Sequence, residues 1–259
     1  MKESDIINGI ILSLGRKTYP VRELIELCRP FGISEGRLRT WLSRRTKQGF
    51  LVKTPGGRTA AYALSEKGRR ISSNVALSFR PPDWNEWDGT WWGFAFTVPE
   101  EMKKERRRIR TKLESYRFAR WYGGFWIRPV RENEKIMERL NGQDHGSLIR
   151  FTPMNPFTKE KTDELWDVSA LSKEFGRALS DIDESERDIP GYSPEEAHVE
   201  RIHTGNRIVP LLFKDPLLPP AFLPEGWEGN RLKKRFLEWD ERISARAAPF
   251  WKSVFENNL

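Results

Sequence analysis

The chain has 259 residues, of which 37% are hydrophobic and 32% are charged. It is long enough to bury a core, and too apolar for a disordered protein. No segment reaches the roughly 18 consecutive apolar residues that a membrane span requires. The single cysteine, Cys28, excludes an internal disulfide framework. The N-terminus starts with acidic residues and lacks a cleavage site of small residues, so we expect no signal peptide and a cytoplasmic location.

The net charge of +8 is unevenly distributed. Residues 1–80 contain 16 Lys and Arg against 6 Asp and Glu, whereas residues 81–259 contain 29 against 31. All of the excess positive charge therefore lies in the first third of the chain. Such a concentration predicts a module that binds a polyanion. The alternative is a basic, solvated surface.

Three helices are predicted in this basic part. Apolar residues at helical spacing predict the first helix from Ser4 to its end at Gly15, and a second, short one ending near Pro30. Ser34 is a good N-cap for a third helix that ends at Gly49. A helix–turn–helix of this kind places its second helix in a DNA groove.

The third helix separates apolar from polar side chains. Leu38, Trp41 and Leu42 share one face. Arginine can bond guanine edges, and Ser and Thr can reach bases or phosphates. A solvated charged face is the alternative, but residues 33–58 hold seven Lys or Arg and a single acid, where an ordinary exposed helix mixes both signs. The expected DNA-binding residues on and beside this helix are Ser34, Arg37, Arg39, Thr40, Ser43, Arg44 and Lys47.

A hairpin is predicted directly after this helix. Residues 50–53 and 60–64 suggest two short strands around Pro55-Gly56-Gly57. Lys53, Arg58 and Thr59 lie on or near its tip. A basic hairpin in this position is the wing of a winged helix, and we expect these three residues to touch the DNA backbone or the minor groove.

A linker over residues 80–90 precedes an alternation of strands and helices. The predicted strands are 90–98, the pair within 118–129 that is joined across Gly123-Gly124, and 147–153; the predicted helices are 100–118 and 132–141. The order β-α-β-β-α-β predicts a ferredoxin-like split βαβ unit. Met102, Ile109 and Leu113 are expected on the buried side of the first helix. Its basic run is interpreted as a solvated face or a dimer rim in preference to a nucleic-acid contact.

Residues 162–259 are predicted to be mainly helical. We expect helices at 165–179, at about 194–213 and from about 230, with a polar loop at 180–194 and a proline-rich turn before the last helix. Arg231, Lys233, Lys234 and Arg235 form a basic cluster near the start of that helix. Cations are unfavourable there, so the cluster either meets an anion or supplies solubilising charge.

The chain resembles the PaaX-like transcriptional repressors, a family that includes the phenylacetate catabolism regulator. The matching stretches are ISEGRLRTWLSRRTKQGFLV with its hairpin, WDGTWWGFAFTVPE, GGFWIRP and LLFKDPLLPPAFLPEGWEG, which span most of residues 5–245. The resemblance implies an α+β protein in three parts: a winged helix (1–80), a ferredoxin-like, Cas2-type domain with an expected role in dimerisation (88–160), and a helical domain expected to bind an effector (162–259). It also implies a homodimer on palindromic, double-stranded operator DNA.

The resemblance further implies release from DNA by an aryl-CoA thioester such as phenylacetyl-CoA. Such an effector needs cations for its phosphates and an apolar or stacking place for its ring. The expected effector-binding residues are His203, Arg207, Trp227, Arg231, Lys234 and Arg235. The chain departs from the family pattern at Arg45, where a core-facing aliphatic residue is expected. The third helix is therefore either rotated about its axis or ends before Gly49, which puts the roles of Arg44 and Lys47 in question.

Two rival functions remain. Cas2-like domains suggest a metal-dependent nuclease, but Thr97 stands where its aspartate would fall, and a hydroxyl cannot replace a carboxylate on a divalent cation. His145, His198 and His203 show no metal-ligand spacing. We therefore expect no catalytic residues, no metal and no cofactor. The second rival is a winged helix that binds only another protein, which predicts weak, salt-insensitive DNA binding.

Overall fold

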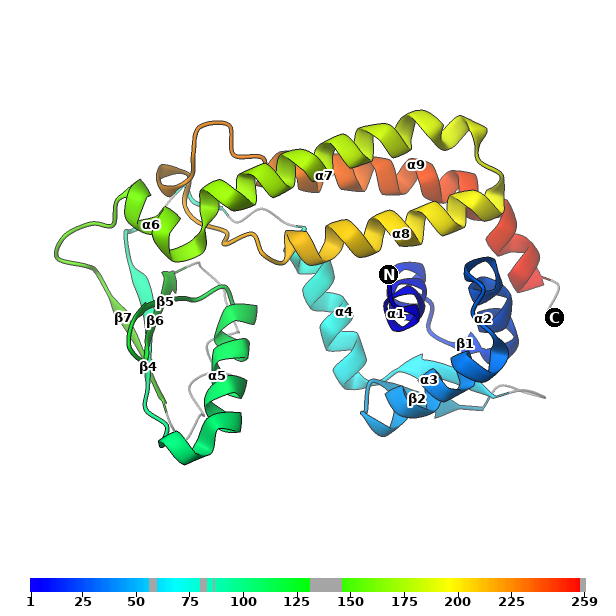
Figure 1. Ribbon diagram of the computed structural model, residues 1–259, viewed down its shortest axis with the longest axis horizontal. Coiled ribbons are helices and arrows are strands. Elements are labelled where there is room, and N and C mark those ends of the chain that lie inside the picture. Colours follow the sequence, from blue (N-terminus) through cyan, green and yellow to red (C-terminus); the bar gives the residue numbers. More distant parts are fainter. Residues whose placement is uncertain (56–59, 80–82, 86, 131–145, 257–259) are drawn as a thin grey trace. The chain divides into compact units, whose positions relative to one another are not determined.

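A computed structural model describes residues 1–55, 60–79, 83–85, 87–130 and 146–256 (Figure 1). The fold is mixed α/β, with helical N- and C-terminal parts and a central antiparallel sheet. The chain forms two compact units. The first contains Met1–Phe79, Arg177–Leu212 and Arg231–Leu259, and the second contains Arg80–Gly176 and Phe213–Asn230.

The first unit begins with the three expected helices. They are α1 (Glu3–Leu14), α2 (Val21–Cys28) and α3 (Glu35–Lys47), with a 3₁₀ turn at Arg29–Phe31 after α2. Gly15 ends α1 with a φ of 60°, a left-handed conformation that glycine adopts without steric cost. Ser34 caps α3, as predicted, because its side chain accepts a hydrogen bond from the Arg37 backbone N–H.

A small sheet and a fourth helix follow. The strands β1 (Tyr19–Pro20), β2 (Leu51–Thr54) and β3 (Ala61–Leu64) pair antiparallel in the order β1-β3-β2. The two predicted hairpin strands are thus present, whereas residues 56–59 between them, with Arg58 and Thr59, lie outside the described part of the chain. The helix α4 (Glu66–Ser78) was not predicted from the sequence.

The C-terminal helices join the core of the N-terminal residues. Ile202 from α8 (Pro194–Leu212) and Val254 from α9 (Gly229–Glu256) belong to the same buried cluster as Ile10, Leu24 and Leu38. In Figure 1, α1 lies beside α8. The two helices approach closely at Gly9 of α1, where an added Cβ would lie 2.7 Å from Oδ1 of Asn206 of α8.

Two predictions for the C-terminal part were wrong. The expected helix at 165–179 is divided into α6 (Lys159–Trp166) and α7 (Val168–Asp188) by Asp167, whose φ of 52° interrupts the helical geometry. The expected loop at 180–194 is helical as far as Asp188, because Ile182 and Ser185 continue the buried face of α7. A 3₁₀ turn at Ile189–Gly191 then leads into α8.

The second unit contains the central sheet. Its strands are β4 (Trp91–Phe96), β5 (Ala119–Tyr122), β6 (Phe125–Pro129) and β7 (Gly146–Phe151), all paired antiparallel in the order β5-β6-β4-β7. This is the order expected of a split βαβ unit. The predicted helix at 132–141 lies outside the described residues.

The helix α5 (Lys103–Ser115) covers one face of this sheet. Ile109 and Leu113 are buried against Phe94 and Trp126, as expected. The prediction for Met102 was wrong: this side chain is 41% exposed, because Met102 belongs to a 3₁₀ turn (Glu100–Met102) that precedes α5.

Candidate nucleic-acid interface

The helix α3 presents one apolar and one polar face. Leu38, Trp41 and Leu42 are buried, with exposed fractions of 4% or less. The polar face is open to solvent, because the apolar face holds the helix against the core. Its exposed residues are Ser34, Arg37, Arg39, Thr40, Ser43, Arg44 and Lys47, and Lys53 on β2 is exposed as well.

Arg45 fixes the rotation of α3. Its guanidinium lies over the ring of Trp41, at 5.3 Å from the centroid, and over that of Phe50, at 5.7 Å. The side chain therefore covers the edge of the core with its aliphatic stem and stacks on aromatic rings. The helix neither rotates nor ends early, and Arg44 and Lys47 point to solvent.

Carboxylates neutralise two of the cations on this face. Arg37 forms an ion pair with Glu3 of α1, and Arg39 pairs with Glu35 at 2.7 Å. Exposed pairs of this kind contribute about 0–1 kcal/mol, so a phosphate can displace them. Arg44, Lys47 and Lys53 make no ion pair with any acid among the described residues. The unbalanced charge expected from the sequence is thus present at three positions.

A pocket that the sequence did not reveal lies between α1 and α3. Its volume is about 290 Å³, and Glu3 and Ser4 of α1 face Arg37, Thr40 and Arg44 of α3 across it. The acidic residue was missed because its partner stands 34 positions later in the chain.

The expected effector residues on α8 are engaged within the protein. His203 is half-buried, with its ring 5.5 Å from that of Phe31, and burial lowers its pKa. Arg207 is exposed and pairs with Asp181 at 3.5 Å. These contacts within the protein account for the positions of both side chains without a ligand.

The cations of α9 differ from one another. Arg235 is half-buried and pairs with Asp183, Glu186 and Glu238, and hydrogen bonds to these three carboxylates raise its pKa above the usual value. Lys234 is exposed, with its ammonium 3.9 Å from Glu238, and Arg231 is exposed too.

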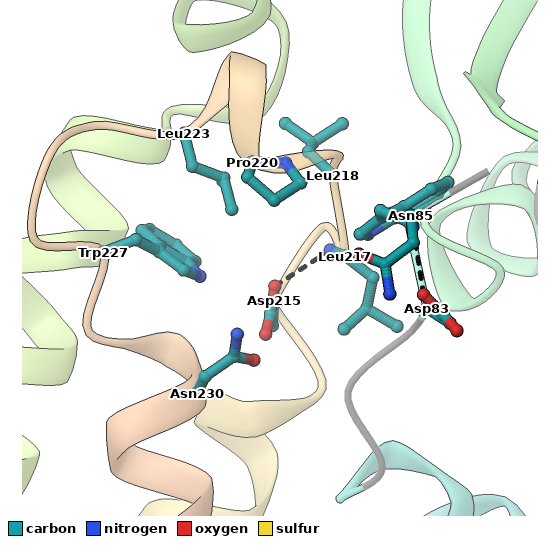
Figure 2. Close-up of a pocket in the computed structure, with 10 residues that line it drawn as sticks. Asp83, Asn85, Asp215, Leu217, Leu218, Pro220, Leu223, Trp227 and Asn230 are labelled. Atoms are coloured by element: carbon teal, nitrogen blue, oxygen red, sulfur yellow. Dashed lines mark hydrogen bonds between the residues drawn. The ribbon is translucent and has the colours of Figure 1, made fainter. Parts of the chain in front are cut away.

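Trp227 lines a different pocket, of about 240 Å³, in the second unit (Figure 2). Figure 2 shows its indole pointing towards Asp215, whose Oδ1 accepts a hydrogen bond from the backbone N–H of Leu217 at 2.9 Å. Six of the ten lining residues are aromatic or aliphatic and the other four are Asp or Asn, and no Lys or Arg is among the described residues that form the walls. The pocket can hold an apolar ring, and it supplies no cation for a phosphate. Its lining residues are Asp83, Trp84, Asn85, Asp215, Leu217, Leu218, Pro220, Leu223, Trp227 and Asn230.

His198 is structural. It is fully buried, its Nε2 donates to the carbonyl oxygen of Leu27 at 3.1 Å, and its Nδ1 accepts from the indole N–H of Trp251 at 3.1 Å. Burial lowers its pKa to about 4. Across the described residues, no three His, Cys, Asp or Glu side chains lie close enough to hold a metal ion, and no helix has the length and apolar character to cross a membrane.

Comparison with known proteins gives a consistent result over most of the chain. Residues 9–68 match the family described as PaaX-like protein, residues 84–165 the PaaX protein central Cas2-like domain, and residues 164–253 the PaaX-like protein C-terminal domain. The transcriptional repressor PaaX of Escherichia coli K12 is 24% identical over 251 residues, which cover 91% of this chain and 78% of the repressor.

A solved structure has a similar fold. It is the uncharacterized protein Rv0674 from Mycobacterium tuberculosis, with a TM-score of 0.62 and 24% sequence identity. The match covers 93% of this chain and 95% of that one.

Proposed function

Because the chain belongs to the PaaX-like protein family, we propose that it is a DNA-binding transcriptional regulator. Its similarity to a transcriptional repressor supports a regulator without enzymatic activity. Residues 1–79 act as a winged helix-turn-helix in this proposal, with α3 as the recognition helix and the β2–β3 hairpin as the wing.

The observation that carries the proposal is the exposed face of α3. Arg44 and Lys47 project to solvent without an acidic partner in the described chain, and Lys53 does the same at the start of the hairpin. Unpaired cations on a helix that fits a major groove bond phosphate oxygens or guanine edges. Arg39 can join them, because its exposed pair with Glu35 is weak.

We propose a cytoplasmic homodimer that binds a palindromic operator, since a twofold symmetric protein reads two half-sites, with the central-sheet domain as the dimer contact. An aryl-CoA thioester such as phenylacetyl-CoA then releases the DNA. The pocket at Trp227 supports a place for the aryl group, while the phosphates require cations outside that pocket.

DNA binding is tested on the DNA upstream of the protein's own gene, by footprinting and by fluorescence anisotropy at increasing salt. We expect the affinity to fall steeply with salt, with a slope of log K against log salt that changes by about 0.9 for each phosphate contact. Lys47→Ala should reduce this slope. Lys252→Ala, which removes an exposed cation from α9, is the matched control.

The same measurement separates this function from a protein-interaction module. Weak binding that is insensitive to salt, with equal slopes for the wild type and Lys47→Ala, contradicts the proposal.

To test the effector, phenylacetyl-CoA is titrated against the protein–DNA complex, with free CoA and phenylacetate as controls. Retention of the complex at all ligand concentrations removes the effector from the proposal and leaves DNA binding intact.

A further inference from the structure

The pocket between α1 and α3 combines features of an anion site. It is bounded by Glu3 and Ser4 at the first turn of α1 and by Arg37, Thr40 and Arg44 along α3. Arg37 and Arg44 are seven residues apart, so two helical turns place them on the same side of α3. A volume of about 290 Å³ is ample for a tetrahedral oxyanion.

An anionic oxygen already occupies part of this pocket. The carboxylate of Glu3 forms the ion pair with Arg37, across 34 residues of sequence. Both side chains are accessible, with exposed fractions of 44% for Glu3 and 65% for Arg37. A pair this exposed is weak and exchanges readily with another anion.

Besides Arg37, the pocket offers one exposed cationic donor, the guanidinium of Arg44. Arg44 has no acidic partner among the described residues. The side chain of Trp41 forms part of the pocket wall and is 4% exposed, and its indole N–H donates to no described group. The indole nitrogen itself is closed off from the pocket by the surrounding atoms, so Arg44 is the donor that a ligand in this pocket meets beside Arg37.

We infer that this pocket seats one phosphate of the DNA backbone, and that Glu3 is a competing carboxylate that holds Arg37 until the phosphate replaces it. The inference rests on the proposed function, because it names the contact that α1 adds to the α3 interface. Glu3 then weakens binding to any duplex by a similar factor, since a backbone phosphate is present in every sequence.

The test compares two variants with the same change in charge. Glu3→Gln removes the competing carboxylate, whereas Asp5→Asn removes an exposed carboxylate from the same turn of α1 that does not line the pocket. Affinity for a random-sequence duplex is measured by fluorescence anisotropy at several salt concentrations. We expect Glu3→Gln to bind about two- to fivefold more tightly than Asp5→Asn, the range that corresponds to one exposed ion pair.

A double-mutant cycle connects the effect to Arg37. In an Arg37→Met background, Glu3→Gln and Asp5→Asn should change duplex affinity equally, because the cation for which carboxylate and phosphate compete has gone. Equal effects of the two variants in the Arg37 wild-type background overturn the inference. They leave the proposed function standing, provided that the wild type binds the duplex.

A second arm distinguishes the source of the phosphate. Inorganic phosphate is titrated into isotope-labelled protein, and the side-chain Nε–H signal of Arg37 is followed by NMR, with that of Arg39 as the reference. We expect a larger shift at Arg37, and tighter phosphate binding in Glu3→Gln. A shift at Arg37 in a protein that does not bind duplex overturns DNA as the source, together with the proposed function. No preferential shift at Arg37 overturns the anion site.

Discussion

The guanidinium of Arg45 lies over the indole ring of Trp41, 5.3 Å from its centroid, while the adjacent Arg44 projects into solvent. The two neighbouring arginines therefore differ in role. Arg45 closes the edge of the core through stacking, and Arg44 remains available to a ligand.

We predict that Arg44→Ala and Arg45→Ala separate binding from stability. Arg44→Ala should cost about 1–3 kcal/mol of specific DNA binding if the residue reads a base, with unchanged thermal stability. Arg45→Ala should lower the free energy of unfolding by about 1 kcal/mol, because it loses the stacking and the covering stem. Thermal melting and anisotropy on the same samples check both. Equal binding losses without any change in melting would contradict the division.

The two cations of α9 should also differ. Arg235→Ala leaves Asp183 and Glu186 without this partner, so we expect a loss of about 1–2 kcal/mol in unfolding free energy. Lys234→Ala, one residue earlier and exposed, should stay within about 0.5 kcal/mol of the wild type. Chemical denaturation measures both. A stable Arg235→Ala variant that has lost its response to phenylacetyl-CoA would instead establish Arg235 as an effector residue.

His198 should make the protein sensitive to acid. Its pKa is about 4 in the folded state, because of burial, against a usual value of 6.5. Between these values the unfolded state binds the proton more readily, so stability is constant above about pH 6.5 and falls as the pH is lowered towards 4. We expect a loss of up to about 2 kcal/mol in unfolding free energy at about pH 5 from this residue alone.

The variant His198→Gln isolates that contribution. Denaturation curves at about pH 7.5 and about pH 5 compare it with the wild type. The variant should be less stable at the higher pH, because the hydrogen bonds with Leu27 and Trp251 are altered. It should also lose less on acidification. An identical pH dependence in the two proteins counts against a neutral, buried His198.

Two helical glycines should respond to alanine with opposite signs. A Cβ on Gly68 of α4 would lie 2.4 Å from the carbonyl oxygen of Phe50, a backbone atom that cannot move aside easily. Gly68→Ala should therefore destabilise the protein by more than about 1 kcal/mol. Gly205 of α8 faces open space, so Gly205→Ala should gain about 0.5–1 kcal/mol from helix propensity. Melting temperatures distinguish the two.

The prediction of α3 succeeded because its signals are local. Ser34 caps the helix, Leu38 and Leu42 repeat at helical spacing, and Gly49 follows its end. The strands of the central sheet were also predicted, with Gly123-Gly124 between β5 and β6. The arrangement β5-β6-β4-β7 then follows from the order of the elements.

The prediction of a loop at 180–194 failed for a physical reason. Its acidic residues suggested a solvated segment, but Asp183 and Glu186 pair with Arg235, about 50 residues later. Ser185 is buried against α9, and its hydroxyl accepts a hydrogen bond from the indole N–H of Trp239, which offsets the cost of burying a polar group. The carboxylates were therefore evidence of helix packing, which periodicity within one segment does not reveal.

The sequence by itself determined where the positive charge lies and which face of α3 carries it, because charge and helical period depend on near neighbours. The matching stretches of sequence also indicated the family. The tertiary structure decided which cations are free. Glu3 reaches Arg37 and three carboxylates reach Arg235, whereas Arg44 has no such partner among the described residues. Ion pairs form between side chains that folding brings within about 4 Å, whatever their separation along the chain.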